Sequence, residues 1–295
     1  MTKDWPTYNE ALVKRGTILL DLTHLQDWKQ ELHKMNQGKE GARYRYPETL
    51  IRLQALLRSI YGLPYRQLQG FTLALARWEP ALMVPCYSTT CRRLNKMRVS
   101  LDPVIAPGKP VTIAVDSSGI KVGDRGEWMR QKWRRRRGFL KVHLAVDVDS
   151  KQIVALEVTD ERTGDAPVLV PLVEGAGKHC KVARVLGDGA YDSRSIFNYL
   201  DDRGVEPVIK VRRNSSTRAR GSPARRMAVL EQLEDLEGWK KRTGYGRRWM
   251  VETAFSVFKR VFGESVAARS FKGMVQEIMI KASVYNLLMR LNPIT

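Results

Sequence analysis

The chain has 295 residues, and its 51 lysines and arginines against 31 acidic residues give a formal net charge of +20 at pH 7. Hydrophobic residues make up 43% of the sequence, which is enough for a folded core and too much for a disordered chain. No segment approaches the roughly 18 consecutive apolar residues of a membrane span, and the first residues do not resemble a secretion signal. We therefore expect a cytoplasmic protein with no membrane partner, and the positive charge favours a nucleic acid as the partner.

Residues 1–105 have apolar side chains at helical spacing and predict an all-helical domain. Pro47 precedes one helix, which Gly62 ends, and Pro64 begins a second helix that extends to about residue 78. A third, short helix extends to about residue 97, with Ser88 or Thr89 as its N-cap.

The third helix is basic and follows a turn, which is the order of elements in helix-turn-helix DNA readers. An ordinary helical hairpin with a charged outer face fits the same pattern. In the first interpretation, the polar face of the helix contacts DNA through Thr90, Arg92, Arg93 and Asn95.

Residues 102–110 contain three prolines and a glycine and predict a linker, after which the hydrophobic period changes. Short apolar runs predict strands at residues 111–115, 119–122, 141–147, 153–158, 183–186 and 207–211. Helical patterns occupy residues 165–174, 191–203 and the segment from 227 onward, which has breaks near Gly238 and Gly263 and a last helix at about 273–291. Strands that come first and then alternate with helices predict an α/β domain at residues 111–295, built on a mixed sheet with flanking helices.

Two arginine-rich segments interrupt this domain. Residues 125–141 hold eight basic residues, and residues 210–226 hold seven and no acid. Arginine dominates in both segments, which suits phosphate binding. We expect DNA contacts from Arg134, Arg135, Arg136 and Arg137 in the first segment and from Arg212 and Arg213 in the second.

Three acidic residues occupy positions suited to catalysis. Asp116 follows an apolar strand, Asp188 follows another between two glycines, and Glu252 lies among apolar residues of a predicted helix. Ligands of sheet enzymes gather at strand ends, although each aspartate alone is also compatible with a turn or cap. Arg248 and Lys259 share the helix face of Glu252. Three such carboxylates could hold two Mg²⁺ ions for displacement at phosphorus.

These residues resemble the DDE transposases of bacterial insertion sequences. The spacing Tyr245-x2-Arg248-x3-Glu252-x6-Lys259 matches the tyrosine–arginine–glutamate–lysine signature of one branch of that family. Residues 115–122 and 188–192 resemble the segments around its first and second aspartates. Residues 5–12 and 87–93 are also similar to its non-catalytic part, so the resemblance spans essentially the whole chain.

The resemblance implies a helical, helix-turn-helix-like DNA-binding domain at residues 1–105 and a ribonuclease-H-like catalytic domain at residues 111–295. It implies that Asp116, Asp188 and Glu252 bind two Mg²⁺ ions, for which Mn²⁺ can substitute. Tyr245, Arg248 and Lys259 would contact DNA near the cleaved end.

The implied activity is recognition of terminal inverted repeats, cleavage that frees 3′-hydroxyl ends, and joining of those ends to target DNA. The partners would be double-stranded DNA and at least one further copy of the chain, as a nucleoid-associated dimer or higher oligomer. Two other functions remain compatible with the sequence: a DNA-binding regulator derived from a transposase, and a metal-dependent nuclease without strand transfer.

Some relatives contain a β-rich insertion between the second aspartate and the glutamate. Here residues 189–251 contain one predicted strand, so the sequence predicts no insertion-domain role and assigns Trp239 to packing.

Overall fold

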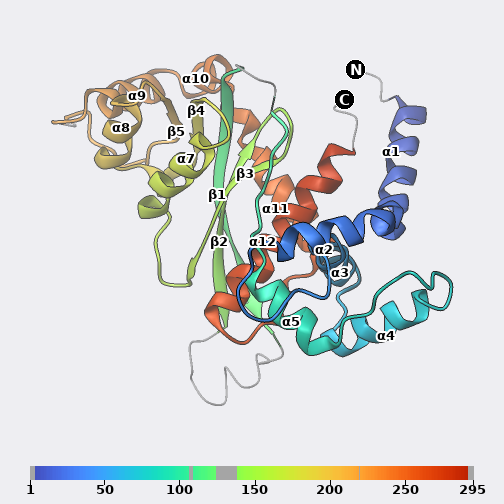
Figure 1. The fold of residues 1–295 in the computed structure, drawn as a ribbon. Coiled ribbons are helices and arrows are strands. Elements are labelled where there is room, and N and C mark those ends of the chain that lie inside the picture. The colour runs from blue at the N-terminus through green and yellow to red at the C-terminus, as the bar shows by residue number, and fades with distance from the viewer. Residues whose placement is uncertain (1–3, 106–108, 124–137, 219, 292–295) are drawn as a thin grey trace. The chain divides into compact units, whose positions relative to one another are not determined.

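The computed structural model describes residues 4–105, 109–123, 138–218 and 220–291 (Figure 1). The chain divides into two compact units. The first comprises residues 1–100, 261–263 and 276–295, and the second comprises residues 101–260 and 264–275.

The first unit is helical. Its elements are α1 (Trp5–Thr17), η1 (Ile18–Leu20), η2 (Thr23–Asp27), α2 (Trp28–Asn36), α3 (Glu48–Tyr61), α4 (Tyr65–Leu75), α5 (Tyr87–Lys96) and the larger part of α12 (Phe271–Arg290). Gly62 ends α3 with φ +64°, a left-handed conformation that glycine adopts at little cost. Neither Ser88 nor Thr89 caps α5, because the helix begins at Tyr87 and Cys86 occupies the N-cap position. Both hydroxyls contact the Cys86 sulfur.

The C-terminal helix explains a difference from the predicted domain division, which placed all of residues 111–295 in one domain. Ile280 of α12 packs in one buried cluster with Ile51, Ala55 and Leu94. Gln276 also donates hydrogen bonds to the backbone carbonyls of Leu94 (2.9 Å) and Met97 (2.8 Å). The amphipathic pattern of this helix was visible in the sequence, but its packing partner was not.

Among its described residues, the second unit contains a six-stranded mixed sheet with strand order β3-β2-β1-β4-β5, and β6 pairs separately with β1. β1 is antiparallel to β2 and parallel to β4 and β6, β2 is antiparallel to β3, and β4 is parallel to β5. The strands are β1 (Val111–Val122), β2 (Phe139–Asp147), β3 (Ile153–Asp160), β4 (Val182–Gly187), β5 (Glu206–Ile209) and β6 (Ser265–Val266). The mixed α/β architecture predicted from the sequence is confirmed.

Helices cover this sheet, with α7 (Leu169–Gly177) and α8 (Arg194–Asp201) on one side and α11 (Trp249–Phe262) on the other (Figure 1). A buried cluster joins Ile113 and Val115 of β1 to Leu172 of α7 and Phe197 of α8. The helical elements are η3 (Ala166–Val168), α7 (Leu169–Gly177), η4 (Gly189–Tyr191), α8 (Arg194–Asp201), α9 (Pro223–Glu234), α10 (Leu236–Thr243), η5 (Tyr245–Arg248), α11 (Trp249–Phe262) and the start of α12. None of the helices in the described ranges combines the length and apolar character needed to cross a bilayer.

One predicted strand boundary in this unit was wrong. The expected strands at 111–115 and 119–122 form one strand, because the backbone stays paired with β2 through the polar residues Ser117 and Ser118. The helix break predicted near Gly238 lies at Asp235, whose carboxylate accepts a hydrogen bond from the Gly238 N–H (2.8 Å) and caps α10.

Candidate active site

Asp116 and Asp188 are brought together by the parallel pairing of β1 and β4. Ala114 of β1 is in register with Leu186 of β4, and each aspartate lies two residues beyond its member of that pair. Side chains two residues apart point to the same face of a strand, so the two carboxylates project from one side of the sheet. The Asp116 carboxylate accepts a hydrogen bond from the Ser117 N–H (2.8 Å), and the Asp188 carboxylate accepts one from the Ala190 N–H (2.9 Å).

Arg248 links the third acid to the first. It lies in η5, directly before α11, and one guanidinium nitrogen is 3.3 Å from Asp116 Oδ2. The other terminal nitrogen donates a hydrogen bond to Glu252 Oε1, one helical turn further along. The guanidinium therefore bridges a carboxylate of the sheet and a carboxylate of the helix.

Burial and neighbouring charges shift the pKa values of two groups in the site. Burial raises the pKa of Asp116, and the negative charges of Asp188 and Glu252 raise it further, against the opposing effects of the Ser117 N–H and Arg248. Burial also raises the pKa of the Tyr245 hydroxyl, which interacts with Arg248. The Tyr245 ring packs against Trp239, with ring centroids 5.1 Å apart, and Trp239 is buried.

Lys259 stands apart from this group. It lies seven residues beyond Glu252 on α11, about 10 Å along a helix axis. Within the described residues it forms no ion pair. The structure therefore brings Tyr245, Arg248 and Glu252 of the signature together at the two aspartates and leaves Lys259 apart from them.

The donor set of the site suits a divalent cation, because Mg²⁺ prefers carboxylate oxygens. Even so, the described part of the chain contains no group of three His, Cys, Asp or Glu side chains close enough to hold an ion. Between Asp116 and Glu252 the positive charge comes from the Arg248 guanidinium. The carboxylates thus fit a metal in their chemistry, and in this arrangement an arginine balances them.

A second acid of the 188–192 segment, to which the sequence assigned no role, is the centre of a buried network. The Asp192 side chain is 0% exposed and accepts hydrogen bonds from Arg225 Nε (2.6 Å) and Nη2 (3.0 Å). It also accepts from Ser215 Oγ (2.7 Å) and the Arg212 N–H (3.0 Å). Arg212 Nε in turn donates to the Gly189 carbonyl (2.9 Å). These hydrogen bonds connect the arginine-rich segment at residues 210–226 to the loop that follows Asp188.

Nothing local in the sequence links Asp192 to Arg225, because 33 residues separate them. The sequence offered no signal that singles out Asp192, since Asp201, Asp202 and Glu206 all lie closer to the segment of seven basic residues.

Of the four residues of α5 that were predicted to contact DNA, two are engaged within the helical unit and two are exposed. Thr90 is 2% exposed and its hydroxyl donates to Gln54 Oε1 (2.7 Å). Arg93 pairs with Glu48 (2.6 Å) and donates to the Tyr46 carbonyl (3.0 Å). Both side chains are engaged within the helical unit as they stand. Arg92 and Asn95 are exposed, with hydrogen bonds to α5 carbonyls.

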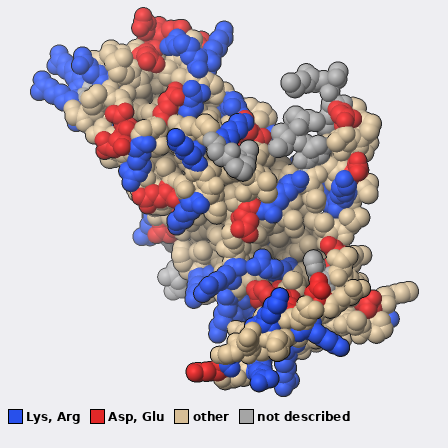
Figure 2. Space-filling model, turned by 45° about the horizontal axis from the view of Figure 1, so that its top comes forward, with Lys and Arg blue, Asp and Glu red and all other residues tan. Residues whose placement is uncertain are grey.

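The connection before α5 also differs from that of a helix-turn-helix. A helix-turn-helix joins its helices through about 3–4 residues, whereas residues 76–86 separate α4 from α5. Among the remaining predicted contacts, Arg212 and Arg213 are exposed. Arg134, Arg135, Arg136 and Arg137 lie outside the described residues. Lysine and arginine side chains occur over much of the face drawn in Figure 2, interspersed with acids.

Comparison with known families places the chain in a class. The sequence matches the transposase DDE domain family over residues 107–287. A second family of the same description matches residues 13–125. Because the first match covers more than half of the chain, the protein belongs to the transposase DDE domain family, and membership implies an enzyme that cleaves or transfers DNA. The resemblance to DDE transposases is confirmed, while the Tyr-Arg-Glu-Lys branch stays a prediction.

Among solved structures, the chain is similar to one described as the cryo-EM structure of piggyBac transposase synaptic complex with hairpin DNA. The alignment covers 93% of this chain and 75% of that chain, with 10% sequence identity and a TM-score of 0.42. A likeness at this level establishes neither the fold nor the function of this chain.

Proposed function

We propose that the chain is an active insertion-sequence transposase of the Tyr-Arg-Glu-Lys branch, with Asp116, Asp188 and Glu252 as its catalytic carboxylates. The observation that supports it most directly is the convergence of three separate motifs. Two adjacent parallel strands present Asp116 and Asp188, and Arg248 joins Asp116 to Glu252. The mixed sheet with helices on both sides is consistent with the proposed ribonuclease-H-like fold.

In this proposal the carboxylates of Asp116, Asp188 and Glu252 would hold two Mg²⁺ ions, for which Mn²⁺ could substitute. When bound, the ions would supply Lewis-acid chemistry for the attacking oxygen and positive charge for the phosphate. The protein contributes position and charge, since phosphoryl transfer leaves little covalent work to side chains.

Arg248 is the cation best placed to meet a DNA phosphate at this site, because its guanidinium already lies at the carboxylates. Its planar fork suits bidentate phosphate contacts. Tyr245, held by its packing on Trp239, fixes the backbone from which Arg248 extends. Lys259, about two turns further along α11, would contact DNA at a distance from the cleaved bond.

The reaction proposed for these residues begins with attack of water on the phosphodiester at each transposon end, which breaks the bond from phosphorus to the 3′ oxygen and frees a 3′-hydroxyl. Each hydroxyl then attacks a phosphodiester of target DNA and displaces the 3′ oxygen of the target strand. Two ends must be held at once, so we propose a dimer or higher oligomer on double-stranded DNA, in the bacterial cytoplasm at the nucleoid. Arg92 and Asn95 remain the exposed candidates of α5 for reading the terminal repeats.

The test is a cleavage and strand-transfer assay with labelled element-end DNA, target DNA and Mg²⁺. Glu252→Gln should abolish both products, because the amide supplies no negative charge at the site. Glu237→Gln is the matched control, since that glutamate is exposed on α10 and pairs only with Lys240 among the described residues. Cleavage without joined product would indicate a nuclease, and binding without cleavage by the wild type would indicate a DNA-binding regulator.

A further inference from the structure

Helix α9 carries an apolar stripe on its exposed side. Met227 is 55% exposed, Leu230 is 39% exposed and Leu233 is 64% exposed, and the three follow one another at three-residue spacing. The opposite side of α9 faces the interior of the second unit through Val229 and Gln232, which are buried. An apolar side chain exposed singly needs no explanation, whereas a row of them on one side of a helix indicates a surface that binds a partner.

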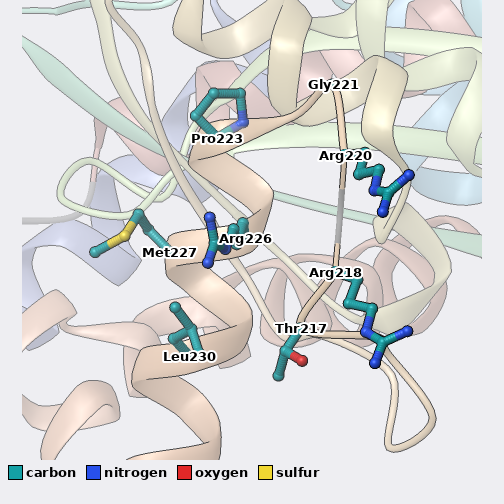
Figure 3. A pocket seen from close by; sticks show the side chains of 8 residues that line it. All are labelled: Thr217, Arg218, Arg220, Gly221, Pro223, Arg226, Met227 and Leu230. Atoms are coloured by element: carbon teal, nitrogen blue, oxygen red, sulfur yellow. The ribbon is translucent and has the colours of Figure 1, made fainter.

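The surface beside this stripe is hollowed (Figure 3). A cavity of about 800 Å³ lies against α9, and its lining includes Arg226, Met227 and Leu230. Arg218 and Arg220 belong to the other part of the lining, and their guanidinium groups point away from the helix (Figure 3). The helix side of the cavity therefore offers an apolar surface with one cation, and there is room for a side chain from another molecule.

The charged residues of α9 are placed against the preference of a helix. A helix favours acidic residues in its first turn and basic residues in its last turn, and α9 has neither. Instead, Arg226 lies in the first turn and Glu234 is the last residue, four positions before and four positions after Leu230. Within the described ranges, neither side chain forms an ion pair. Both ends of the helix therefore carry a charge that its own chain leaves unbalanced.

A second copy of the helix, running antiparallel, matches both the stripe and the charges. In a two-fold pairing centred on Leu230, residues equally far before and after it come to the same level. Leu230 then meets its counterpart, and Met227 lies level with Leu233 of the second copy, which enters at the cavity. Arg226 lies level with Glu234 of the second copy, so the pairing joins opposite charges at both ends.

The size of this contact decides when it forms. A specific, stable interface buries about 1,200–2,000 Å², and three apolar side chains from each of two short helices bury less than that. Free protein should therefore associate weakly, at high micromolar concentrations. Two copies held on paired DNA ends have a much higher effective concentration, at which a weak contact is occupied.

We propose that the exposed side of α9 binds the same side of α9 in a second copy of this chain, antiparallel and about a two-fold axis. The inference rests on the proposed function, since the pairing of two DNA ends brings the second copy. Met227, Leu230 and Leu233 form the apolar centre of the contact. The two pairs of Arg226 with Glu234 of the other copy set its antiparallel direction.

The test is sedimentation velocity without DNA, over a protein concentration series that extends to the high micromolar range. Arg226→Glu and Glu234→Arg each place like charges level with one another, so each variant alone should associate about tenfold more weakly than wild type. An equimolar mixture of the two variants should recover wild-type association, because every pair again joins opposite charges. Leu230→Glu should abolish association, since two carboxylates then meet at the apolar centre.

Lys181→Glu and Glu161→Arg are the matched controls, because they make the same two charge reversals at exposed positions of the same unit. Alone or mixed, they should leave association unchanged. Circular dichroism and thermal melting check that every variant is folded.

Monomeric wild type across the whole series, or a mixture that associates no better than its two components, would overturn the α9 contact. If that protein still joined element ends to target DNA, the proposed function would stand without this contact. Association through α9 in a protein that neither cleaves nor joins DNA would support the contact and overturn the proposed function.

Discussion

Removing the Asp192 carboxylate should destabilise the second unit strongly. The perturbation is Asp192→Ala, which takes away an acceptor of four hydrogen bonds: two from Arg225, one from Ser215 and one from the Arg212 N–H. The Arg225 side chain is only 12% exposed, so its guanidinium cannot recover full hydration. Breaking a buried pair by deleting one partner costs about 3–5 kcal/mol, and we expect a loss of that size.

The assay is urea unfolding followed by tryptophan fluorescence. A matched control is Glu206→Ala, because Glu206 pairs with Arg184 on the same unit with both side chains nearly half exposed. Exposed pairs contribute about 0–1 kcal/mol, so the control should change the free energy of unfolding by no more than that.

The double variant Asp192→Ala/Arg225→Met separates pairing from packing. With both charges gone, no charge is left buried and unpaired, so the double variant should be less destabilised than the sum of the two single variants. Additive losses, or a loss below about 0.5 kcal/mol for Asp192→Ala, would refute the argument that this pair holds the arginine-rich segment in place.

Three further predictions concern pH, metal binding and thiol chemistry. Burial lowers the pKa of His143 to about 4, below the value of about 6.5 expected in the unfolded chain. The stability that the neutral His143 ring contributes is therefore complete above pH 6.5 and is lost as pH falls toward 4. In a plot of the urea midpoint of unfolding against pH, His143→Leu should reduce the slope between about pH 6.5 and 4. An unchanged slope would contradict the lowered pKa of His143. Arg248→Gln should bind Mn²⁺ more tightly than wild type in calorimetry without DNA, because the guanidinium no longer competes for Asp116 and Glu252; equal affinity would show that it does not compete. Hydrogen bonds from Ser88 and Thr89 lower the pKa of the exposed Cys86 to about 7, so iodoacetamide should alkylate it at pH 7 faster in wild type than in Ser88→Ala, and equal rates would refute that effect.

The position of Asp188 could be predicted because its signal is local. An apolar strand that ends in an acid places that acid at the carboxyl end of the strand, whichever strands are neighbours. Asp116 was also expected to follow a strand, but it lies inside β1. The continuity of β1 could not be predicted in this way. Ser117 and Ser118 resemble a turn in isolation, and only their pairing with β2 keeps them in a strand. The local sequence therefore predicted that a strand exists here, whereas the length of the strand depends on its pairing with β2.

The polar face of α5 shows the same limit on a helix. A helical pattern identifies side chains that share a face, but it does not say which face meets another helix. Thr90 looked available for DNA because it is polar, and it is buried because Gln54 of α3 supplies a hydrogen-bond partner. Arg93 is engaged in the same way by Glu48. Partners 36 and 45 residues away decide the orientation.

The arginine-rich segment at 210–226 shows why a count of charges does not identify a binding surface. Two of its arginines, Arg212 and Arg225, hold the segment to the loop after Asp188 through hydrogen bonds to Gly189 and Asp192. Neutralising the whole segment would remove these contacts together with any DNA contact, and loss of folding would be indistinguishable from loss of binding. Within the described residues, the guanidinium groups of Arg218 and Arg226 form no such hydrogen bonds. Replacing these two arginines alone therefore distinguishes loss of DNA binding from loss of folding. Pairing and burial, rather than net charge, therefore decide which cations are free to meet a polyanion.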